Sequence, residues 1–267
     1  MFTTRIAIAM RRLLFTVLLC SLAPQPGSAI EIGSSFIDRF SHLSRARWFV
    51  SDGWANGDHQ ACMFSAQNIT IDSAGLQLML LGRQVKDRKQ TCAEVQSLAA
   101  FGYGTFEFRM RPAAGAGIDS GVFTYSGPPA QDQPHDEIDL EFLGRYSDKV
   151  QLNYFVNGQT QGNSLNEIPA NAFETMNTYA IQWFPDKLRW FVNGKLLREV
   201  VRKEGAPYPT HPSKIYLTIW NTSTLTDWLG TFDSSKLPMS IGYEWVAYTK
   251  AGEPCQFPES ILCSQKD

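Results

Sequence analysis

The sequence has few charges and no surplus of basic residues. Charged residues make up 19% of the 267 positions, and the formal net charge is −2. Proteins that bind nucleic acid or anionic membranes usually have a basic surplus, so we expect neither partner. The low charge and the 12% aromatic content exclude a disordered chain, a collagen-like repeat and a coiled coil.

Several short functional motifs are also absent from the sequence. It has no glycine-rich phosphate loop, no GxSxG elbow and no CxxC or HxxxH spacing. We therefore expect no metal at the catalytic site and no required cofactor. No linker, repeat or low-complexity segment follows residue 30, so residues 30–267 are expected to form a single domain with a short C-terminal tail.

Residues 1–29 have the pattern of a secretory signal peptide. Three arginines precede an apolar stretch at 13–22, and small residues follow at 27–29. The apolar stretch is too short to span a bilayer comfortably. An uncleaved anchor and a lipoprotein signal at Cys20 are the alternatives. Cleavage would place the protein outside the cell or in the periplasm, with no membrane attachment.

Four cysteines follow this segment. An even number in a secreted chain predicts two disulfides. Of the three connectivities, we expect Cys62–Cys92 with Cys255–Cys263, because the second pair closes a short C-terminal loop.

Alternation of apolar and polar residues dominates the rest of the chain. Asn193-Gly194 joins two such segments and predicts a type I′ hairpin over 188–200. Short helical turns are expected only near 36–43 and 170–175. Many short strands in one unit predict an all-β jelly-roll sandwich. The other strands are expected at 104–111, 150–156, 179–184, 214–220 and 239–249.

The densest chemical signal is the segment 135–142. Side chains alternate on a strand, so Glu137, Asp139 and Glu141 share one face and apolar residues share the other. Mutual repulsion raises the pKa of at least one carboxyl. Glycosidases need such a pair, with one carboxylate ionised and one carboxyl protonated. A calcium site and a plain solvated surface are the alternatives to a catalytic role.

Aromatic and polar side chains elsewhere could line a sugar cleft, since sugar rings stack on aromatic rings. Each single aromatic residue could equally belong to the core. Trp48, Trp183, Trp190 and Trp245 fit the core. The cleft candidates are Trp54, Phe123, Tyr125, Tyr154, Trp220 and Trp228, with Asn56, Glu94, Asn153, Asn221 and His135 as polar partners.

The segment HDEIDLEFLG at 135–144 resembles the active-site strand of glycoside hydrolase family 16. The similarity is strongest to bacterial lichenases, which are endo-β-1,3-1,4-glucanases, and to rhizobial endoglycanases that trim succinoglycan. It extends from about residue 33 to 250. The matching blocks are 52–57, 91–97, 101–112, 121–128, 149–158, 190–197 and 219–230.

This resemblance implies two curved antiparallel sheets and a retaining mechanism. Glu137 would be the nucleophile, Asp139 the assisting acid and Glu141 the general acid/base. It also implies the Cys62–Cys92 disulfide. The implied cleft residues are Trp54, Asn56, Glu94, Phe123, Tyr125, His135, Asn153, Trp220 and Trp228. A transglycosylase and a non-catalytic glucan-binding module are the alternatives.

Four residues depart from the lichenase pattern, which leaves the substrate open between a β-glucan and an acidic exopolysaccharide. His135 replaces a Trp, and the other departures are Gln96, Phe155 and Thr218. Many lichenases hold a structural calcium through an Asp near the C-terminus. Glu244 stands there in this chain, so a structural calcium is a weaker expectation. We expect a monomer.

Overall fold

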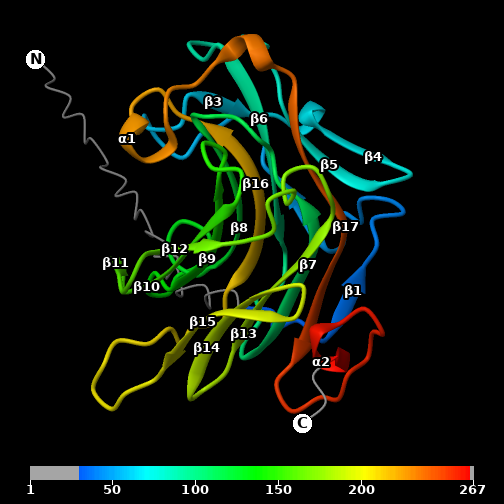
Figure 1. Ribbon diagram of the computed structural model, residues 1–267, viewed down its shortest axis with the longest axis vertical. Helices are drawn as coiled ribbons and strands as arrows, with labels where there is room; N and C mark the ends of the chain where they lie inside the picture. Colours follow the sequence, from blue (N-terminus) through cyan, green and yellow to red (C-terminus); the bar gives the residue numbers. More distant parts are fainter. Residues whose placement is uncertain (1–29, 265–267) are drawn as a thin grey trace, which may run out of the picture.

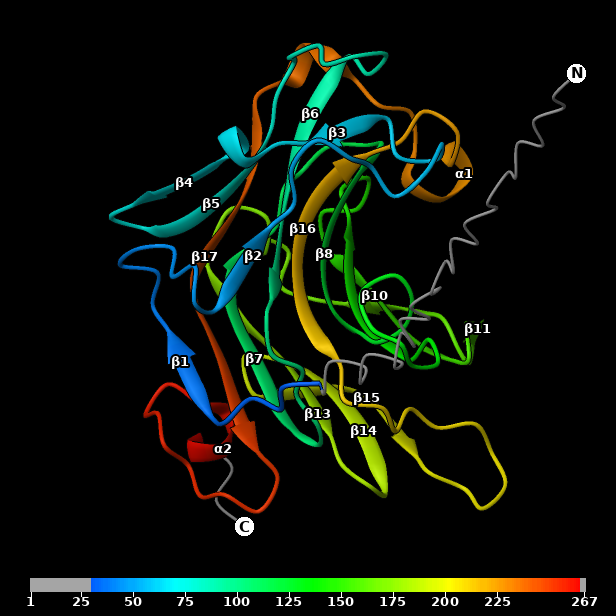
Figure 2. The ribbon, with the colours of Figure 1, turned by 180° about the vertical axis from the view of Figure 1, so that it is seen from behind.

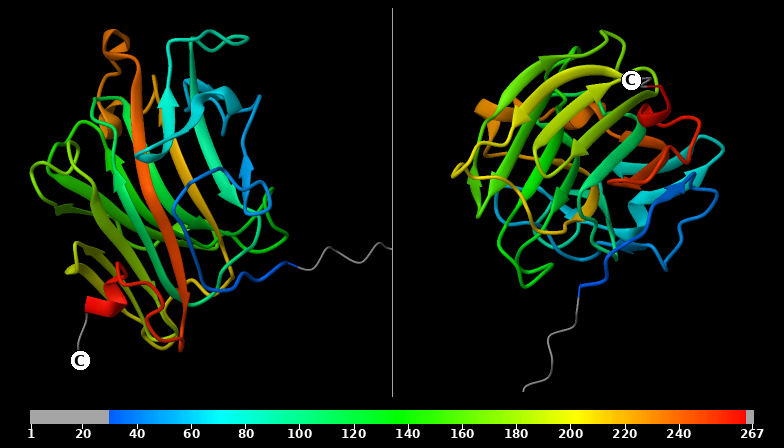
Figure 3. Two further views of the ribbon diagram at one scale, coloured as in Figure 1. Left: turned by 90° about the vertical axis from the view of Figure 1, so that its right-hand side faces the viewer. Right: turned by 90° about the horizontal axis from the view of Figure 1, so that it is seen from below.

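The computed structural model describes residues 30–264, which form two packed antiparallel sheets (Figures 1 and 2). Both sheets curve, as the side and bottom views in Figure 3 show. The all-β jelly-roll prediction is confirmed. The expected signal peptide at 1–29 lies outside the described residues. No helix within 30–264 is long and apolar enough to cross a bilayer.

The first sheet has nine strands and the second has eight. The nine-stranded sheet has the order β11 (Gln159–Thr160), β10 (Lys149–Val156), β9 (Glu137–Leu143), β8 (Ile118–Tyr125), β16 (Lys214–Asn221), β6 (Gln90–Ser97) and β2 (Trp48–Val50), with β12 (Ser164–Glu167) on β10 and β3 (Cys62–Phe64) on β6. The eight-stranded sheet has the order β15 (Lys195–Val201), β14 (Lys187–Val192), β13 (Asn177–Trp183), β7 (Gly104–Arg111), β17 (Met239–Lys250), β5 (Gly75–Leu80) and β4 (Ile69–Asp72), with β1 (Phe36–Asp38) on β17. The short helices are α1 (Thr226–Leu229), α2 (Ile261–Ser264), η1 (Ala66–Asn68) and η2 (Ser234–Lys236).

The core lies between the sheets and consists of the apolar side chains that alternate with polar ones along each strand. On β9, Ile138, Leu140 and Phe142 are at most 1% exposed. Their burial turns the intervening acidic residues to the opposite face. The Trp190 indole donates a hydrogen bond to the backbone oxygen of Asp139, which ties the two sheets together behind the acidic face. The four tryptophans predicted for the core are all buried.

The predicted hairpin is confirmed, because Asn193 and Gly194 join β14 and β15 with φ of 48° and 79°. The first expected helical turn is wrong, because Phe36 pairs with Tyr248 and the segment begins as an edge strand on β17. The second segment does form hydrogen-bonded turns, including a bond from the Thr175 backbone to the Asn171 oxygen that has the spacing of a helical turn, although no regular helix results.

Both expected disulfides are present. Cys62–Cys92 joins β3 to β6, and Cys255–Cys263 closes the tail after β17. The tail packs on the outer face of the eight-stranded sheet, where Ile261 contacts Ala180 and Phe191. Figure 1 shows it beside the end of β17.

Candidate active site

The three predicted carboxylates lie on β9, in the middle of the nine-stranded sheet. Strands β8 and β10 flank β9 on its two sides, and their register places one residue of each beside every acid. The rows are Tyr125–Glu137–Phe155, Phe123–Asp139–Asn153 and Gly121–Glu141–Gln151. The acids therefore occupy the face of the sheet that points away from the core.

Glu137 has a direct partner in His135. The His135 Nε2 lies 2.6 Å from Glu137 Oε2, and the two side chains are 31% and 20% exposed. The imidazole stacks on the Phe155 ring at 5.4 Å, with 18° between the planes. This stacking holds the ring so that Nε2–H donates to the carboxylate. Glu137 thus remains accessible while its orientation is fixed.

Asp139 is 1% exposed and lies between the two glutamates. Burial, and then the charges of Glu137 and Glu141, raise its pKa well above the usual range. Three carboxyls this close cannot all ionise near neutral pH. Asp139 is therefore suited to hold a proton and to limit the repulsion between its neighbours.

Glu141 is held by a chain of hydrogen bonds from β10 and α1. Gln151 Nε2 donates to Glu141 Oε2 at 2.6 Å, and Trp228 Nε1 donates to Gln151 Oε1 at 2.9 Å. Burial, followed by the charges of Asp119 and Glu137, raises the Glu141 pKa well above its usual value. The geometry and the pKa direction suit a group that donates a proton.

A cleft of about 860 Å³ opens at the Glu137 end of the row. Aromatic rings suited to stacking on a sugar and a few polar groups line it together. It contains seven of the residues predicted from sequence: Trp54, Asn56, Glu94, Phe123, Tyr125, His135 and Glu137. Phe49, His59 and Tyr216 also line it and were not predicted, whereas Gln96, one of the departures from the lichenase pattern, was expected at the cleft and lines it.

The loop that carries Trp54 and Asn56 is held in place by a disulfide and by hydrogen bonds. The disulfide anchors its end to β6. The buried Gln60 side chain accepts a hydrogen bond from the Asn56 backbone and donates to the Cys62 oxygen. Thr222, after β16, donates to the His59 oxygen. The loop is therefore positioned against two strands of the site.

The remaining predicted residues lie toward Asp139 and Glu141, outside the cleft volume described above. Asn153 is opposite Asp139 and accepts a hydrogen bond from Thr160. The Trp220 and Trp228 rings are 6.1 Å apart. Tyr154, a further cleft candidate, faces the core and is 7% exposed, because its register partner is the buried Ile138.

Two groups near the site were not predicted from the sequence. Asp119 on β8 is a further buried acid on this face, and its Oδ2 accepts a hydrogen bond from Trp220 Nε1 at 3.0 Å. An acidic residue inside an apolar strand is the signal that could have identified it. Asp136 binds His211 at 2.7 Å, which supports the turn before β16.

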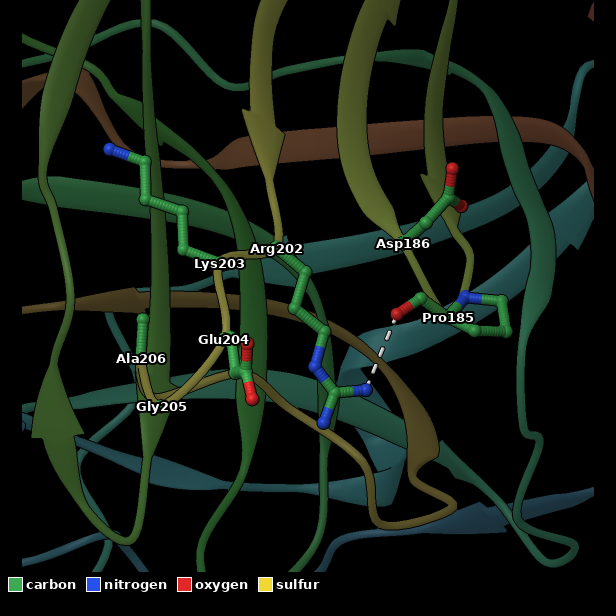
Figure 4. A pocket seen from close by; sticks show the side chains of 7 residues that line it. All are labelled: Pro185, Asp186, Arg202, Lys203, Glu204, Gly205 and Ala206. Atoms are coloured by element: carbon green, nitrogen blue, oxygen red, sulfur yellow. Dashed lines mark hydrogen bonds between the residues drawn. The ribbon is translucent and has the colours of Figure 1, made fainter.

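A second hollow, of about 580 Å³, lies away from the acids (Figure 4). It is formed by the turn before β14 and the loop after β15. Arg202 spans it by donating to the Pro185 oxygen at 3.3 Å. It contains none of the predicted site residues, so it gives no competing candidate for the active site.

Known proteins resemble this chain over most of its length. The family described as "Glycosyl hydrolases family 16" matches residues 56–243, a range that includes all three acids of β9. The chain belongs to glycosyl hydrolase family 16. It is therefore a glycoside hydrolase, and the family assignment made from sequence motifs is confirmed.

Named relatives within family 16 cover most of the chain. The endo-1,3-1,4-beta-glycanase ExoK of Rhizobium meliloti (strain 1021) is 43% identical over 229 residues, 86% of this chain and 84% of the relative. The beta-glucanase of Bacillus subtilis (strain 168) is 36% identical over 239 residues, 89% of this chain and 96% of the relative. The solved structure of Bacillus licheniformis beta-glucanase has a TM-score of 0.76 and 35% identity, covering 82% of this chain and 99% of that one.

The position expected to hold a structural calcium in this family is not well suited to a cation here. Glu244 forms an ion pair with Arg109, with 3.4 Å between Nε and Oε2. The guanidinium already supplies a positive charge, and calcium needs six to eight oxygen ligands. Residues 30–264 contain no cluster of three or more His, Cys, Asp or Glu side chains arranged to hold a metal.

Proposed function

We propose that this family 16 enzyme is a secreted, retaining endo-β-1,3-1,4-glucanase. The row of Glu137, Asp139 and Glu141 on one face of β9 carries the proposal. Support for the substrate class comes from relatives named as an endo-1,3-1,4-beta-glycanase and as beta-glucanases. The N-terminal signal pattern and the two disulfides support secretion.

In the proposed reaction, Glu137 attacks the anomeric carbon while Glu141 protonates the leaving glycosidic oxygen. This gives a covalent glycosyl-enzyme and one released product. Glu141, now ionised, removes a proton from water, which attacks the anomeric carbon and restores Glu137. Asp139 holds a proton between the two groups, so their charges change without repulsion from a third anion.

Substrate binding is assigned to the aromatic and polar residues around these acids. Trp54, Phe123 and Tyr125 offer ring faces to sugars on the Glu137 side, while Asn56 and Glu94 offer hydrogen bonds. Trp220, Trp228 and Asn153 serve the Glu141 side. The polymer is a β-glucan or an acidic exopolysaccharide with such links. No step uses a cofactor or metal, and the enzyme acts as a monomer.

The test is to assay Glu137→Gln and Glu141→Gln on barley β-glucan, laminarin, carboxymethyl cellulose and an acidic rhizobial exopolysaccharide. Each variant should lose at least about 10³-fold in reducing-end release, because each removes an essential catalytic group. Glu199→Gln is the control. It breaks a partly exposed ion pair between Glu199 on β15 and Arg189 on β14 and should keep full activity.

The anomeric configuration of the first product tests the stereochemistry. Proton NMR at early times should show the β-anomer, as expected for retention. An α-anomer would contradict the retaining mechanism. Substantial turnover by either Gln variant would contradict the assigned roles. Products longer than the substrate would show that transfer to a sugar predominates over hydrolysis.

A further inference from the structure

A buried carboxylate that the mechanism above does not use lies beside the acid row. Asp119 is on β8, opposite Trp220 of β16, and is 2% exposed. Its Oδ2 accepts the indole hydrogen bond from Trp220, and its Oδ1 has no hydrogen-bond partner among residues 30–264. Within the same residues, no Lys, Arg or His forms an ion pair with it. Burying an acid costs free energy, and one side-chain hydrogen bond without an ion pair offsets little of that cost. The presence of Asp119 here therefore needs an explanation.

The missing side chain of Gly121 brings Asp119 close to Glu141. Gly121 lies directly opposite Glu141 in the register, and Asp119 is two residues away on the same face of β8. A methyl group on Gly121 would lie 3.2 Å from Asp119 Oδ2 and 3.0 Å from Thr218 Cγ2. Asp119 Oδ2 therefore lies beside Gly121, the residue directly opposite Glu141 in the register.

We propose that Asp119 is a positioning residue of the catalytic centre, which keeps the proton on Glu141 and fixes the Trp220 indole beside it. This inference depends on the proposed role of Glu141 as the general acid. An anion next to a carboxyl favours the protonated form of that carboxyl. In this site the proton is what Glu141 must deliver to the leaving oxygen.

The charges around Glu141 agree with this role. After burial, the Asp119 charge is the largest cause of the raised Glu141 pKa, ahead of the Glu137 charge. Burial raises the pKa of Asp119 itself to about 7, so the two groups titrate as a pair. From β10 and α1, Glu141 meets the uncharged Gln151 and Trp228. Behind Asp119, on β17, lies the buried Tyr243.

A basic side chain that contacts α1 is already engaged by backbone oxygens. Arg145, in the loop after β9, donates to the oxygens of Asp227 and Trp228, at 2.8 Å and 3.3 Å. It anchors α1, which carries Trp228, and forms no ion pair with an acid of the row. The electrostatic potential at Glu141 is therefore set by the neighbouring carboxylates of Asp119 and Glu137.

The experiment is the pH profile of kcat/KM for Asp119→Asn. Asparagine has the same size and can still accept the Trp220 hydrogen bond, so it removes only the charge. The basic limb of the profile, where kcat/KM falls as the pH rises, should move to lower pH by about one unit. The reason is that Glu141 then loses its proton more easily. Asp227→Asn is the matched control. It also removes one negative charge, but from an exposed carboxylate, and should leave the limb in place.

A second variant separates the two parts of the role. Asp119→Leu removes both the charge and the acceptor for Trp220, so it should raise KM as well as shift the limb. A ¹³C NMR titration of the Glu141 carboxyl, in the wild type and in Asp119→Asn, measures the same shift without turnover. Unfolding midpoints establish that each variant is folded.

An unchanged basic limb and an unchanged Glu141 titration in folded Asp119→Asn would overturn the inference. If Glu141→Gln is inactive in the same assays, the proposed function stands and only the role of Asp119 fails. If Glu141→Gln is active, the general-acid assignment itself fails. The two failures are thus distinguishable.

Discussion

At the scale of single residues, the hydrogen bond between His135 and Glu137 fixes the orientation of the Glu137 carboxylate. The two residues are two positions apart on one face, and their side chains meet at 2.6 Å. The ring lies between Phe155 and Tyr125, with centroid distances of 5.4 Å and 4.8 Å. A donor fixed in this way occupies one oxygen of Glu137 and leaves the other available for the proposed attack on the sugar.

His135→Phe should lower kcat/KM about 10- to 100-fold. Phenylalanine keeps a ring that can pack on Phe155 but loses the donor, and a hydrogen bond to a charged group contributes about 1.5–3 kcal/mol. The measurement is kcat/KM on barley β-glucan. His42→Asn is the control, because His42 is exposed, bonds only to Ser41, and lies away from the cleft. An unchanged kcat/KM for His135→Phe would contradict a supporting role.

Local patterns in the sequence predicted the row of acids, and the resemblance to family 16 predicted cleft residues from distant segments. Alternation is a local property, so it placed Glu137, Asp139 and Glu141 on one face of a strand. Asp119 became visible only with the β8–β9 register, which depends on contacts between distant segments. Tyr154 was a cleft candidate from its neighbours in sequence, but its pairing with Ile138 turns it into the core.

At the scale of elements, strand length and clear alternation together decided which parts of the fold could be predicted. The strands β7, β10, β13, β16 and β17 have seven to twelve residues and clear alternation, and all were expected. The strands β6 and β8 have eight residues each but were not expected, because polar residues and a glycine interrupt their pattern. Edge strands such as β1, β2 and β11 have two or three residues. Such a strand shows too little periodicity to predict, because pairing with a neighbour defines it.

The C-terminal tail is attached to the outer face of β7 through Glu107. This carboxylate is 0% exposed and accepts hydrogen bonds from Ser260 Oγ and the Ile261 backbone. Burial raises its pKa to about 7, although the two hydrogen bonds act in the opposite direction. The tail therefore covers an acid that is protonated below about pH 7.

Ionisation of the buried Glu107 should lower the stability of the fold as the pH rises. The folded-state pKa of Glu107 lies above its unfolded value, so its contribution is fully present below about pH 4.5 and is lost as the pH rises through about 7. The loss amounts to about 3 kcal/mol in the free energy of unfolding. Glu107→Gln cannot ionise and should match the wild type at pH 4 but exceed it at pH 8.

Denaturant unfolding of both proteins at several pH values checks this prediction. The difference between them isolates Glu107 from the other buried acids, which are the same in both. Glu253→Gln is the control, because Glu253 is an exposed tail residue that accepts from Ser35 and Gln256. If the Glu107→Gln difference stayed constant with pH, burial of this acid would not control docking of the tail.

At the scale of the whole molecule, the net charge influences which polymer can approach and bind the enzyme. Residues 30–267 carry a formal net charge of −5, since residues 1–29 contain three arginines and no acid. The cleft is lined by the acids Glu94 and Glu137 and contains no Lys or Arg. A neutral glucan can approach this surface freely, whereas an acidic polymer is repelled.

The salt dependence of KM should therefore separate the two candidate substrates. The Debye length falls from about 30 Å at 0.01 M to about 8 Å at 0.15 M, so added salt screens repulsion over the dimensions of the cleft. KM for an acidic exopolysaccharide should decrease several-fold over this range, while KM for barley β-glucan should stay nearly constant. The measurement is initial rate against polymer concentration at both ionic strengths. An acidic polymer whose KM rose with salt would instead be attracted, which would require cationic groups at a binding surface outside the cleft.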